Sequence, residues 1–218
     1  MNLKLQGKRA LVTGSTAGIG ERIAVILARE GATLIIHGRN RERAQHVAES
    51  IHSQGGSADI VLGDLGSDSG CHEIATAVGT VCSSIDVLIN NAAVYVNRSW
   101  DETSPLDWLD IYNSNVCSAV RITRQLLPGM RAKAWGRIIQ ISTGEAMAPM
   151  PHMPEYAASK AGLANLTVSF AQQVAGTGIT VNTVSPASSS PPSCKDSLPE
   201  RRPSRDGAPS GRTSKPMF

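Results

Sequence analysis

The chain alternates short apolar runs with longer segments whose apolar residues recur at three- and four-residue spacing. The apolar runs predict strands at Arg9–Thr13, Thr33–His37, Asp59–Leu62, Val87–Asn90, Arg137–Ser142 and Thr180–Val184. The segments between them predict helices over Ile19–Glu30, Arg41–Gln54, Ser69–Ser83, Leu106–Arg131 and Glu155–Ala175. Strict alternation of strand and helix predicts an α/β fold, in which helices cover both faces of a parallel sheet.

Two of the predicted strands indicate how the sheet is buried. Leu34–Ile36 and Val87–Ile89 are continuous apolar runs, as expected for strands that are covered on both faces. Right-handed crossovers then give a Rossmann-like, doubly wound sheet with the strand order 3-2-1-4-5-6.

The alternation stops at Pro186. Residues 187–218 contain eight Ser and six Pro, and their only sizeable apolar side chains are Leu198, Met217 and Phe218. Such a segment buries too little apolar surface to offset the entropy lost on ordering. The sequence therefore predicts a dinucleotide-binding domain over residues 1–186 and a Ser/Pro-rich, disordered tail over residues 187–218.

Charge and composition narrow the class of protein. Residues 1–186 hold 15 basic and 15 acidic residues, so the formal net charge of +3 comes from the tail, and we expect no nucleic-acid partner. The sequence has no signal-peptide-like start and no run of about 18 apolar residues, which predicts a cytoplasmic protein without a membrane partner. Its four cysteines form no CxxC pair and no Cys/His cluster, so we expect no metal site.

A glycine-rich segment lies between the first predicted strand and the first predicted helix. Gly14, Gly18 and Gly20 allow a tight turn and a close backbone approach to a pyrophosphate. The helix that follows offers free N–H groups and the positive end of its dipole. This arrangement predicts a dinucleotide site.

The end of the second strand bears on the choice of dinucleotide. An NAD site usually offers an acid there to the ribose 2′-hydroxyl, whereas this chain has His37-Gly38-Arg39. Arg39, helped by Arg41, could pair with a 2′-phosphate, which favours NADP(H) over NAD(H). The alternative is that both arginines are solvated at the start of a helix.

A phenol and an ammonium lie one helical turn apart at Tyr156 and Lys160. An unperturbed phenol has a pKa of about 10, and a positive charge on the same helix face favours the phenolate. The pair therefore suits proton transfer near neutral pH. The alternative is a surface pair with no task.

These motifs, in this order, resemble the short-chain dehydrogenase/reductase family over about residues 5–186. Thr13–Gly20 matches its TGxxxGxG loop, Asp64-Leu65 its acid–apolar pair, Asn90–Ala93 its NNAG motif with Ala93 for glycine, and Tyr156 with Lys160 its YxxxK motif. The resemblance implies a cofactor site made of Gly14, Ser15, Thr16, Gly18, Ile19, Gly20, Arg39, Asp64, Leu65, Asn91, Ala92, Tyr156 and Lys160.

The resemblance also implies a reaction. Hydride would pass between NADP(H) and a small carbonyl or alcohol substrate, with Tyr156 as acid/base and Lys160 holding the nicotinamide ribose. Asn115 on the long central helix would position a water in a proton relay, although it could instead only tie that helix to a strand. The family further implies a homodimer or homotetramer, partly through the two longest helices.

Three positions depart from the family pattern. The catalytic serine's position, thirteen residues before Tyr156, is Thr143; Ser142 is adjacent, and both stay candidates, with Ser142 favoured on family chemistry. Ala17 stands where NADP(H)-preferring members often carry a basic residue. Pro186-Ala187 replaces a proline-glycine pair, and the substrate-covering helix pair and seventh strand that should follow are not visible.

The third departure predicts a chain truncated or frameshifted after about residue 186. Contacts between subunits would then be weakened, and a second hypothesis is an inactive chain that retains at most nucleotide or partner binding. The glycine loop alone also permits a methyltransferase-like or other nucleotide-binding α/β protein. Glu145 and the methionines that follow it predict either an adaptable apolar wall of a substrate pocket or a plain surface loop.

Overall fold

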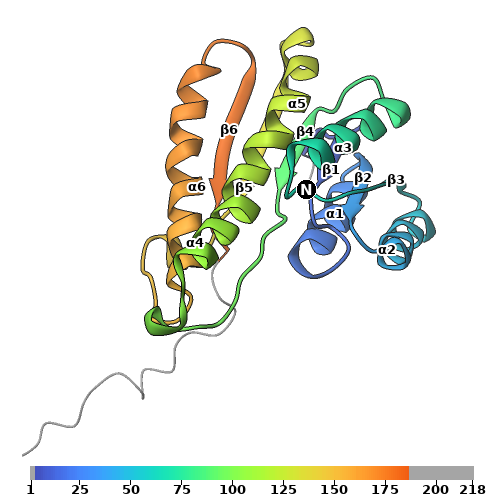
Figure 1. Ribbon diagram of the computed structural model, residues 1–218. Helices are drawn as coiled ribbons and strands as arrows, with labels where there is room; N and C mark the ends of the chain where they lie inside the picture. Colours follow the sequence, from blue (N-terminus) through green and yellow to red (C-terminus); the bar gives the residue numbers. More distant parts are fainter. Residues whose placement is uncertain (1–2, 187–218) are drawn as a thin grey trace, which may run out of the picture. The chain divides into compact units, whose positions relative to one another are not determined.

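The computed structural model describes residues 3–186, which form an α/β domain around one parallel sheet (Figure 1). Its order is β3-β2-β1-β4-β5-β6, so the predicted class and strand order are confirmed. The strands are β1 Arg9–Val12, β2 Thr33–Gly38, β3 Ser57–Leu62, β4 Val87–Asn90, β5 Gly136–Ile141 and β6 Ile179–Val184. The predicted tail and any seventh strand lie outside the described residues.

Helices connect successive strands, as the periodicity predicts. They are α1 Gly18–Arg29, α2 Arg41–Ser53, α3 Asp68–Val81, α4 Pro105–Tyr112, α5 Ser118–Ala132 and α6 Pro154–Gln173. Two short 3-10 turns, η1 at Trp100–Glu102 and η3 at Gly144–Ala146, follow β4 and β5 respectively.

The central helix differs from the prediction. The continuous helix expected over residues 106–131 is α4 and α5, joined by a π-helical turn, η2, at Asn113–Cys117. The Ser118 N–H donates to the Asn113 carbonyl, one residue further back than in an α-helix. The apolar spacing does not reveal this extra residue, because the segments on either side keep helical periodicity.

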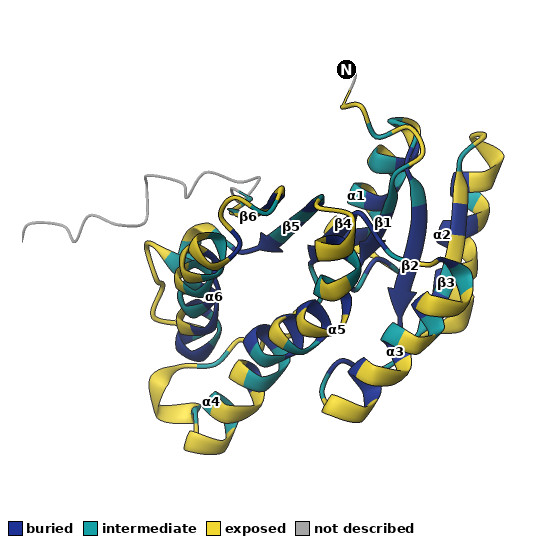
Figure 2. Cartoon of the chain, turned by 90° about the horizontal axis from the view of Figure 1, so that it is seen from above, coloured by how far each residue is buried: buried dark blue, intermediate teal, exposed yellow. Residues whose placement is uncertain are grey.

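Two apolar cores lie on opposite faces of the sheet. Val12 and Ile36 pack with α1 and α2 on one face, whereas their neighbours Leu11 and Ile35 pack with α3, α5 and the C-terminal part of α6 on the other. Figure 2 shows β1, β2 and β4 as a buried layer between these helices. Burial on both faces is the reason that Ala10–Val12 and Leu34–Ile36 are apolar at every position.

The helix starts differ in a way that matters for the site. Side chains of Asn40, Ser67 and Ser104 accept hydrogen bonds from the first turns of α2, α3 and α4. Ala17 precedes α1 and has no side chain that can do so. The first N–H groups of α1 therefore stay available to an anion.

Candidate active site

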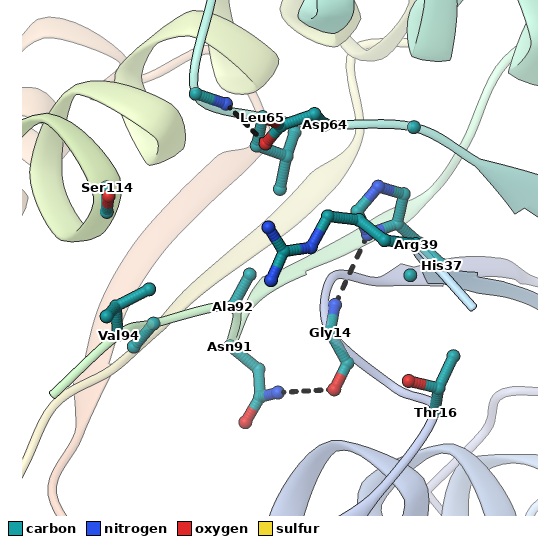
Figure 3. A pocket seen from close by; sticks show the side chains of 14 residues that line it. Gly14, Thr16, His37, Arg39, Asp64, Leu65, Asn91, Ala92, Val94 and Ser114 are labelled. Atoms are coloured by element: carbon teal, nitrogen blue, oxygen red, sulfur yellow. Dashed lines mark hydrogen bonds between the residues drawn. The ribbon is translucent and has the colours of Figure 1, made fainter. Parts of the chain in front are cut away.

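A hollow of about 300 Å³ lies where the carboxyl ends of β1 to β4 meet the loops that follow them (Figure 3). We call it the cofactor pocket. Predicted cofactor residues from four separate segments line it, namely Gly14, Thr16, Arg39, Asp64, Leu65, Asn91 and Ala92. The fold thus brings together positions that are up to about eighty residues apart in the sequence, because parallel strands all end at the same edge of the sheet.

The glycine turn needs its glycines for space as well as for conformation. Gly14 and Gly18 have φ angles of 63° and 61°, in the left-handed region that favours glycine. A Cβ on Gly14 would lie 3.0 Å from the Ala92 Cα, and one on Gly20 would lie 2.4 Å from the Asn91 side-chain nitrogen. Gly18 and Gly20 do not line the pocket; Gly20 lets Asn91 approach the turn.

Asn91 and Thr13 join the turn after β1 to the end of β4. The Asn91 Nδ2 donates to the carbonyls of Thr13 and Gly14 at 2.9 and 3.1 Å. In return, the Thr13 Oγ1 accepts from the backbone N–H groups of Asn91 and Ala92, both at 3.0 Å. These bonds fix the floor of the cofactor pocket without any ligand.

Two further predicted cofactor residues, Ser15 and Ile19, lie outside the pocket wall. Ser15 is fully buried, and its hydroxyl accepts from the His37 N–H at 2.9 Å. Ile19 lies in the first turn of α1 and is 52% exposed, which leaves its side chain open to solvent or to a ligand.

His37 is a pocket residue to which the sequence analysis gave no role. Its Nδ1 accepts from the Gly14 N–H at 3.3 Å, as Figure 3 shows, so the ring braces the glycine turn from β2. Burial lowers the pKa of His37 to about 4, which keeps the imidazole neutral and able to accept this bond. Its position at the end of β2 was the available signal, since this edge of the sheet forms the site.

Arg39 and Asp64 complete the wall of the cofactor pocket. The Arg39 side chain extends into it (Figure 3), and the Asp64 Oδ1 accepts from the Gly66 N–H at 3.0 Å. Arg41, expected to help Arg39, starts α2 and is absent from the residues that line the pocket.

Lys160 lies in α6 with only 2% of its surface exposed. Its Nζ donates to the Ile141 carbonyl at the end of β5, at 2.7 Å, and lies 5.8 Å from the centre of the Tyr156 ring. Burial lowers the pKa of Lys160 to about 8, so the ammonium is still the main form at neutral pH.

The pKa of Tyr156 moves in the opposite direction from the sequence expectation. Burial raises it first, and the negative charge of Glu145 and the neighbouring Tyr95 raise it further. The Tyr95 and Tyr156 rings meet edge-on with centres 5.9 Å apart. The Lys160 ammonium points at the Ile141 carbonyl instead of at the phenol, which explains the difference.

The two candidate hydroxyls after β5 face different partners. Ser142 is 4% exposed, and its hydroxyl donates to the Lys160 carbonyl at 3.2 Å. Thr143 is half-buried, and its hydroxyl accepts from the Glu145 N–H at 3.4 Å, which leaves the hydroxyl proton free to donate to another group. The structure therefore separates two candidates of which the sequence analysis favoured Ser142, since the hydroxyl with a free proton is that of Thr143.

Asn115 links the cofactor pocket to α6. Its Oδ1 accepts from the Val94 N–H at 2.7 Å, and its Nδ2 donates to the Val94 carbonyl at 2.9 Å and to the Ser159 hydroxyl at 3.0 Å. Val94 lines the cofactor pocket, and Ser159 directly precedes Lys160. The side chain thus ties the central helix to the loop after β4 and to α6, and not to a strand as the structural alternative expected; the water relay stays a prediction.

An ion-pair cluster that the sequence did not reveal holds the start of α6. The Glu155 side chain is fully buried and faces the Arg98 Nε at 3.4 Å, and Arg98 also pairs with Asp107. The Arg98 carbonyl accepts from the N–H of Met153. Met153 directly precedes α6 and has a φ angle of 68°, in the left-handed region. The loop after β4 thus fixes the residue next to Tyr156.

This geometry agrees with what comparison with known proteins finds. The model of the short chain dehydrogenase family matches residues 8–201. The chain belongs to the short-chain dehydrogenase/reductase family. It is 38% identical over 190 residues to an uncharacterized oxidoreductase, YvaG, of Bacillus subtilis, covering 86% of this chain and 70% of that one. It is 37% identical over 187 residues to the 3-oxoacyl-[acyl-carrier-protein] reductase FabG of Aquifex aeolicus, covering 85% of this chain and 75% of that one.

Solved structures of the short-chain dehydrogenase/reductase family are similar to this chain over most of its length. L-sorbose reductase of Gluconobacter frateurii, complexed with NADPH and L-sorbose, superposes with a TM-score of 0.82 at 32% identity, covering 85% of this chain and 71% of that one. A 3-oxoacyl (acyl-carrier-protein) reductase of Agrobacterium tumefaciens with NADP bound has a TM-score of 0.81 at 33% identity, covering 86% of this chain and 74% of that one. Within residues 3–186, none of the helices has the length and apolar character needed to cross a bilayer.

Proposed function

We propose that this family member is an NADP(H)-dependent reductase or dehydrogenase of small carbonyl or alcohol compounds. The observation that carries the proposal is a continuous path from cofactor pocket to acid/base pair. Val94 lines the pocket, Asn115 binds Val94 and Ser159, and Lys160 and Tyr156 share the same helix. NADP-bound and NADPH-bound relatives support the choice of cofactor.

The residues present fit a dinucleotide. The uncapped start of α1 offers free N–H groups to a pyrophosphate, and a Cβ on Gly18 would meet no atom within 4 Å, so the backbone is open to a close approach. Asp64 and Leu65 stand at the β3 side of the pocket, where an adenine would lie. Arg39 supplies a positive charge for a 2′-phosphate, and we assign it the preference for NADP(H).

When bound, the nicotinamide supplies or accepts the hydride. Tyr156 donates a proton to the carbonyl oxygen in reduction and accepts one from the alcohol in oxidation. Its raised pKa keeps it protonated over a wide pH range, which favours the reduction direction. The Lys160 ammonium, anchored on the Ile141 carbonyl, would hold a hydroxyl of the nicotinamide ribose.

We assign the substrate-orienting hydroxyl to Thr143. The Ser142 hydroxyl is buried and already donates to the Lys160 carbonyl, whereas Thr143 has a proton left to give. A hydroxyl that donates to the substrate oxygen stabilises the charge that develops there.

We also propose that the chain assembles with copies of itself through α4, α5 and α6. Leu109, Tyr112 and Val168 on these helices are 65%, 47% and 60% exposed, which is costly for large apolar side chains in an isolated subunit. Light scattering behind size-exclusion chromatography tests this, and a monomer at micromolar concentration would contradict it.

The first experiment on function is a fluorescence titration of the full chain with NADPH and NADH. We expect saturable NADPH binding that is tighter than NADH binding, followed by NADPH consumption with at least one ketone from a small panel. Absence of binding of either nucleotide would overturn the proposal. Binding without turnover of any ketone or alcohol would leave a nucleotide-binding protein that lacks the proposed activity.

A further inference from the structure

Four consecutive apolar residues, 93–96, are exposed on the loop that follows β4. The largest of them is Tyr95, which is 69% exposed. An uninterrupted run of exposed apolar side chains is unfavourable in water, and a folded chain keeps one where it serves a function. The run therefore marks a surface that a bound molecule covers.

This run extends from the cofactor pocket to the candidate proton donor. Ala93 and Val94 line the pocket (Figure 3). The next residue, Tyr95, has its ring edge-on to that of Tyr156, with the ring centres 5.9 Å apart. The reacting carbon of a substrate has to be within reach of both the dinucleotide and the Tyr156 hydroxyl. Residues 93–95 join the same two places, so a substituent on that carbon would lie against them.

Hydrogen bonds hold the backbone on both sides of Tyr95. One residue earlier, Val94 binds Asn115 through its N–H and its carbonyl, at 2.7 and 2.9 Å. Three residues later, the Arg98 carbonyl accepts from the Met153 N–H at 2.9 Å. The loop is thus fixed to η2 and to the residue before α6. A side chain presented by such a backbone binds a ligand at a small entropic cost.

The side chains of this surface indicate what kind of substituent fits it. The Tyr95 ring meets one other ring and is still mostly exposed, so part of its surface remains open to a second ring. Aromatic pairs in stacked or edge-on contact are more favourable than their buried area alone predicts. The negative charge of Glu145, which acts on Tyr156, disfavours an acidic substituent. A neutral aromatic ring therefore fits best.

We propose that Tyr95 selects carbonyl and alcohol substrates that carry an aromatic ring beside the reacting carbon, over compounds whose ring is saturated. The substrate ring would pack against the Tyr95 ring. In reduction, the carbonyl carbon gains a hydride from NADPH and the oxygen gains a proton from Tyr156, while the ring is unchanged. Tyr95 is then a specificity-determining residue. This inference rests on the proposed function.

The kinetic test compares the NADPH-dependent reduction of 1-phenylpropan-2-one and 1-cyclohexylpropan-2-one by the full chain. The two ketones have the same skeleton, and neither ring is conjugated with the carbonyl group, so the carbonyl groups have similar intrinsic reactivity. The cyclohexyl ring has the larger apolar surface, and apolar burial alone would favour it. We expect kcat/KM to favour the phenyl ketone instead, by about three- to tenfold.

Three variants test whether the Tyr95 ring is the source of this preference. Tyr95→Leu keeps an apolar side chain without the ring, so kcat/KM should become equal for the two ketones or favour the cyclohexyl ketone. Tyr95→Phe keeps the ring and should keep the preference. The matched control is Trp100→Leu, which removes an exposed ring that packs against Trp108 in the same β4–α4 connection, and it should also keep the preference. Each ratio is taken within one variant, so a change in the reactivity of Tyr156 cancels.

Equal kcat/KM values for the two ketones in the unmodified chain would overturn the inference. A preference that survives in Tyr95→Leu would also overturn it, because the ring would then not be its source. Loss of the preference in Tyr95→Phe would assign it to the hydroxyl, and an equal loss in Trp100→Leu would assign it to the loop as a whole. Either result would contradict the proposed ring contact.

A binding measurement distinguishes failure of this inference from failure of the proposed function. 2-Phenylacetamide and 2-cyclohexylacetamide have the shapes of the two ketones, but NADPH does not reduce their amide groups. In ligand-observed NMR titrations of the full chain with NADPH present, the phenyl amide should bind about three- to tenfold more tightly, and Tyr95→Leu should remove the difference. Equal binding of the two amides would overturn the inference. If neither ketone is reduced, the proposed function fails, and the amide titration still decides whether Tyr95 selects an aromatic ring.

Discussion

The cofactor pocket and the Tyr156 region, meaning Tyr156, Lys160, Thr143 and Glu145, use their polar groups differently. In the pocket, Asn91 binds the backbone of the glycine turn, Thr13 accepts from the backbone after β4, and His37 braces the turn from β2. In the Tyr156 region, Lys160 is buried as an ammonium, the phenol has a raised pKa, and Glu145 has an oxygen without a partner. The hydrogen bonds of the cofactor pocket thus form without a ligand. In the Tyr156 region, burial of charged and polar groups costs electrostatic free energy, which a bound substrate can lower.

The largest expected effect is a loss of kcat that distinguishes the Tyr156 region from the cofactor pocket. Tyr156→Phe removes the proton donor but keeps the ring that meets Tyr95, so kcat should fall by about 10²–10⁴-fold. NADPH affinity should stay within about twofold, because the pocket is fixed by bonds that do not involve Tyr156. Steady-state kinetics and a nucleotide titration measure the two quantities. A kcat within tenfold of the original would show that another group transfers the proton.

The next effect sharpens the assignment within the Tyr156 region. Thr143→Val removes the hydroxyl that we assign to the substrate oxygen and should lower kcat by about 10²-fold. Ser142→Ala is its matched control: we expect kcat to change by less than about threefold, and stability to fall by about 1 kcal/mol because the bond to the Lys160 carbonyl is lost. A large loss of kcat in Ser142→Ala and a small one in Thr143→Val would show that Ser142 supplies the hydroxyl that orients the substrate.

The third prediction concerns the free energy of unfolding, which depends on the charge of the buried Lys160 side chain. Its folded pKa of about 8 lies below the unfolded value of 10.5, so the cost of the buried ammonium is fully present below pH 8. Between pH 8 and 10.5 only the unfolded chain holds the proton, and stability therefore rises with pH until the cost is gone. Lys160→Met should thus be inactive yet more stable at pH 7, by on the order of 2 kcal/mol after the lost bond to Ile141 is counted.

Urea unfolding of both proteins at pH 7 and pH 10.5 measures this difference. The advantage of Lys160→Met should shrink at the higher pH. A variant that is less stable than the original at pH 7 would show that the ammonium stabilises the fold there.

The smallest effect concerns the cofactor pocket. Arg39→Ala should weaken NADPH binding by about tenfold and leave NADH binding unchanged, because only NADPH carries the 2′-phosphate. Arg41→Ala, at a residue that does not line the pocket, is the matched control and should change neither affinity appreciably. An equal loss in both variants would point to long-range electrostatics instead of a direct contact.

Most of the fold could be predicted because each strand and helix carries its own periodicity. The strand predictions agree with the structure to within two residues, and the strand order follows from the handedness of the crossovers. The exception is the π-helical turn at Asn113–Cys117, within which Asn115 binds Val94 and Ser159. Neither partner is near Asn115 in the sequence, so no local pattern could indicate the turn.

The candidate site likewise contains residues that local motifs predict and residues whose roles depend on distant parts of the chain. The glycine turn, Asn91 and the Tyr156–Lys160 spacing are local motifs, and their positions at the ends of strands follow from the fold. The position of His37 at the end of β2 indicates that it is near the site, but not that it accepts a bond from the glycine turn, because a buried neutral imidazole and a solvated one look alike in a sequence. The arrangement of Arg98, Glu155 and Asp107 likewise exists only where the loop after β4 meets α6.

The sequence by itself determined the alternating architecture, the place of the dinucleotide turn and the pairing of Tyr156 with Lys160, since each depends on residues within one or two turns or strands. Only the tertiary structure decided which of Ser142 and Thr143 has a free proton, where the Lys160 ammonium points, and that the Tyr95 ring meets that of Tyr156. These properties arise from burial and from partners distant in the chain. Burial and partners set hydrogen bonding and pKa, and neither can be obtained from a residue's neighbours in sequence.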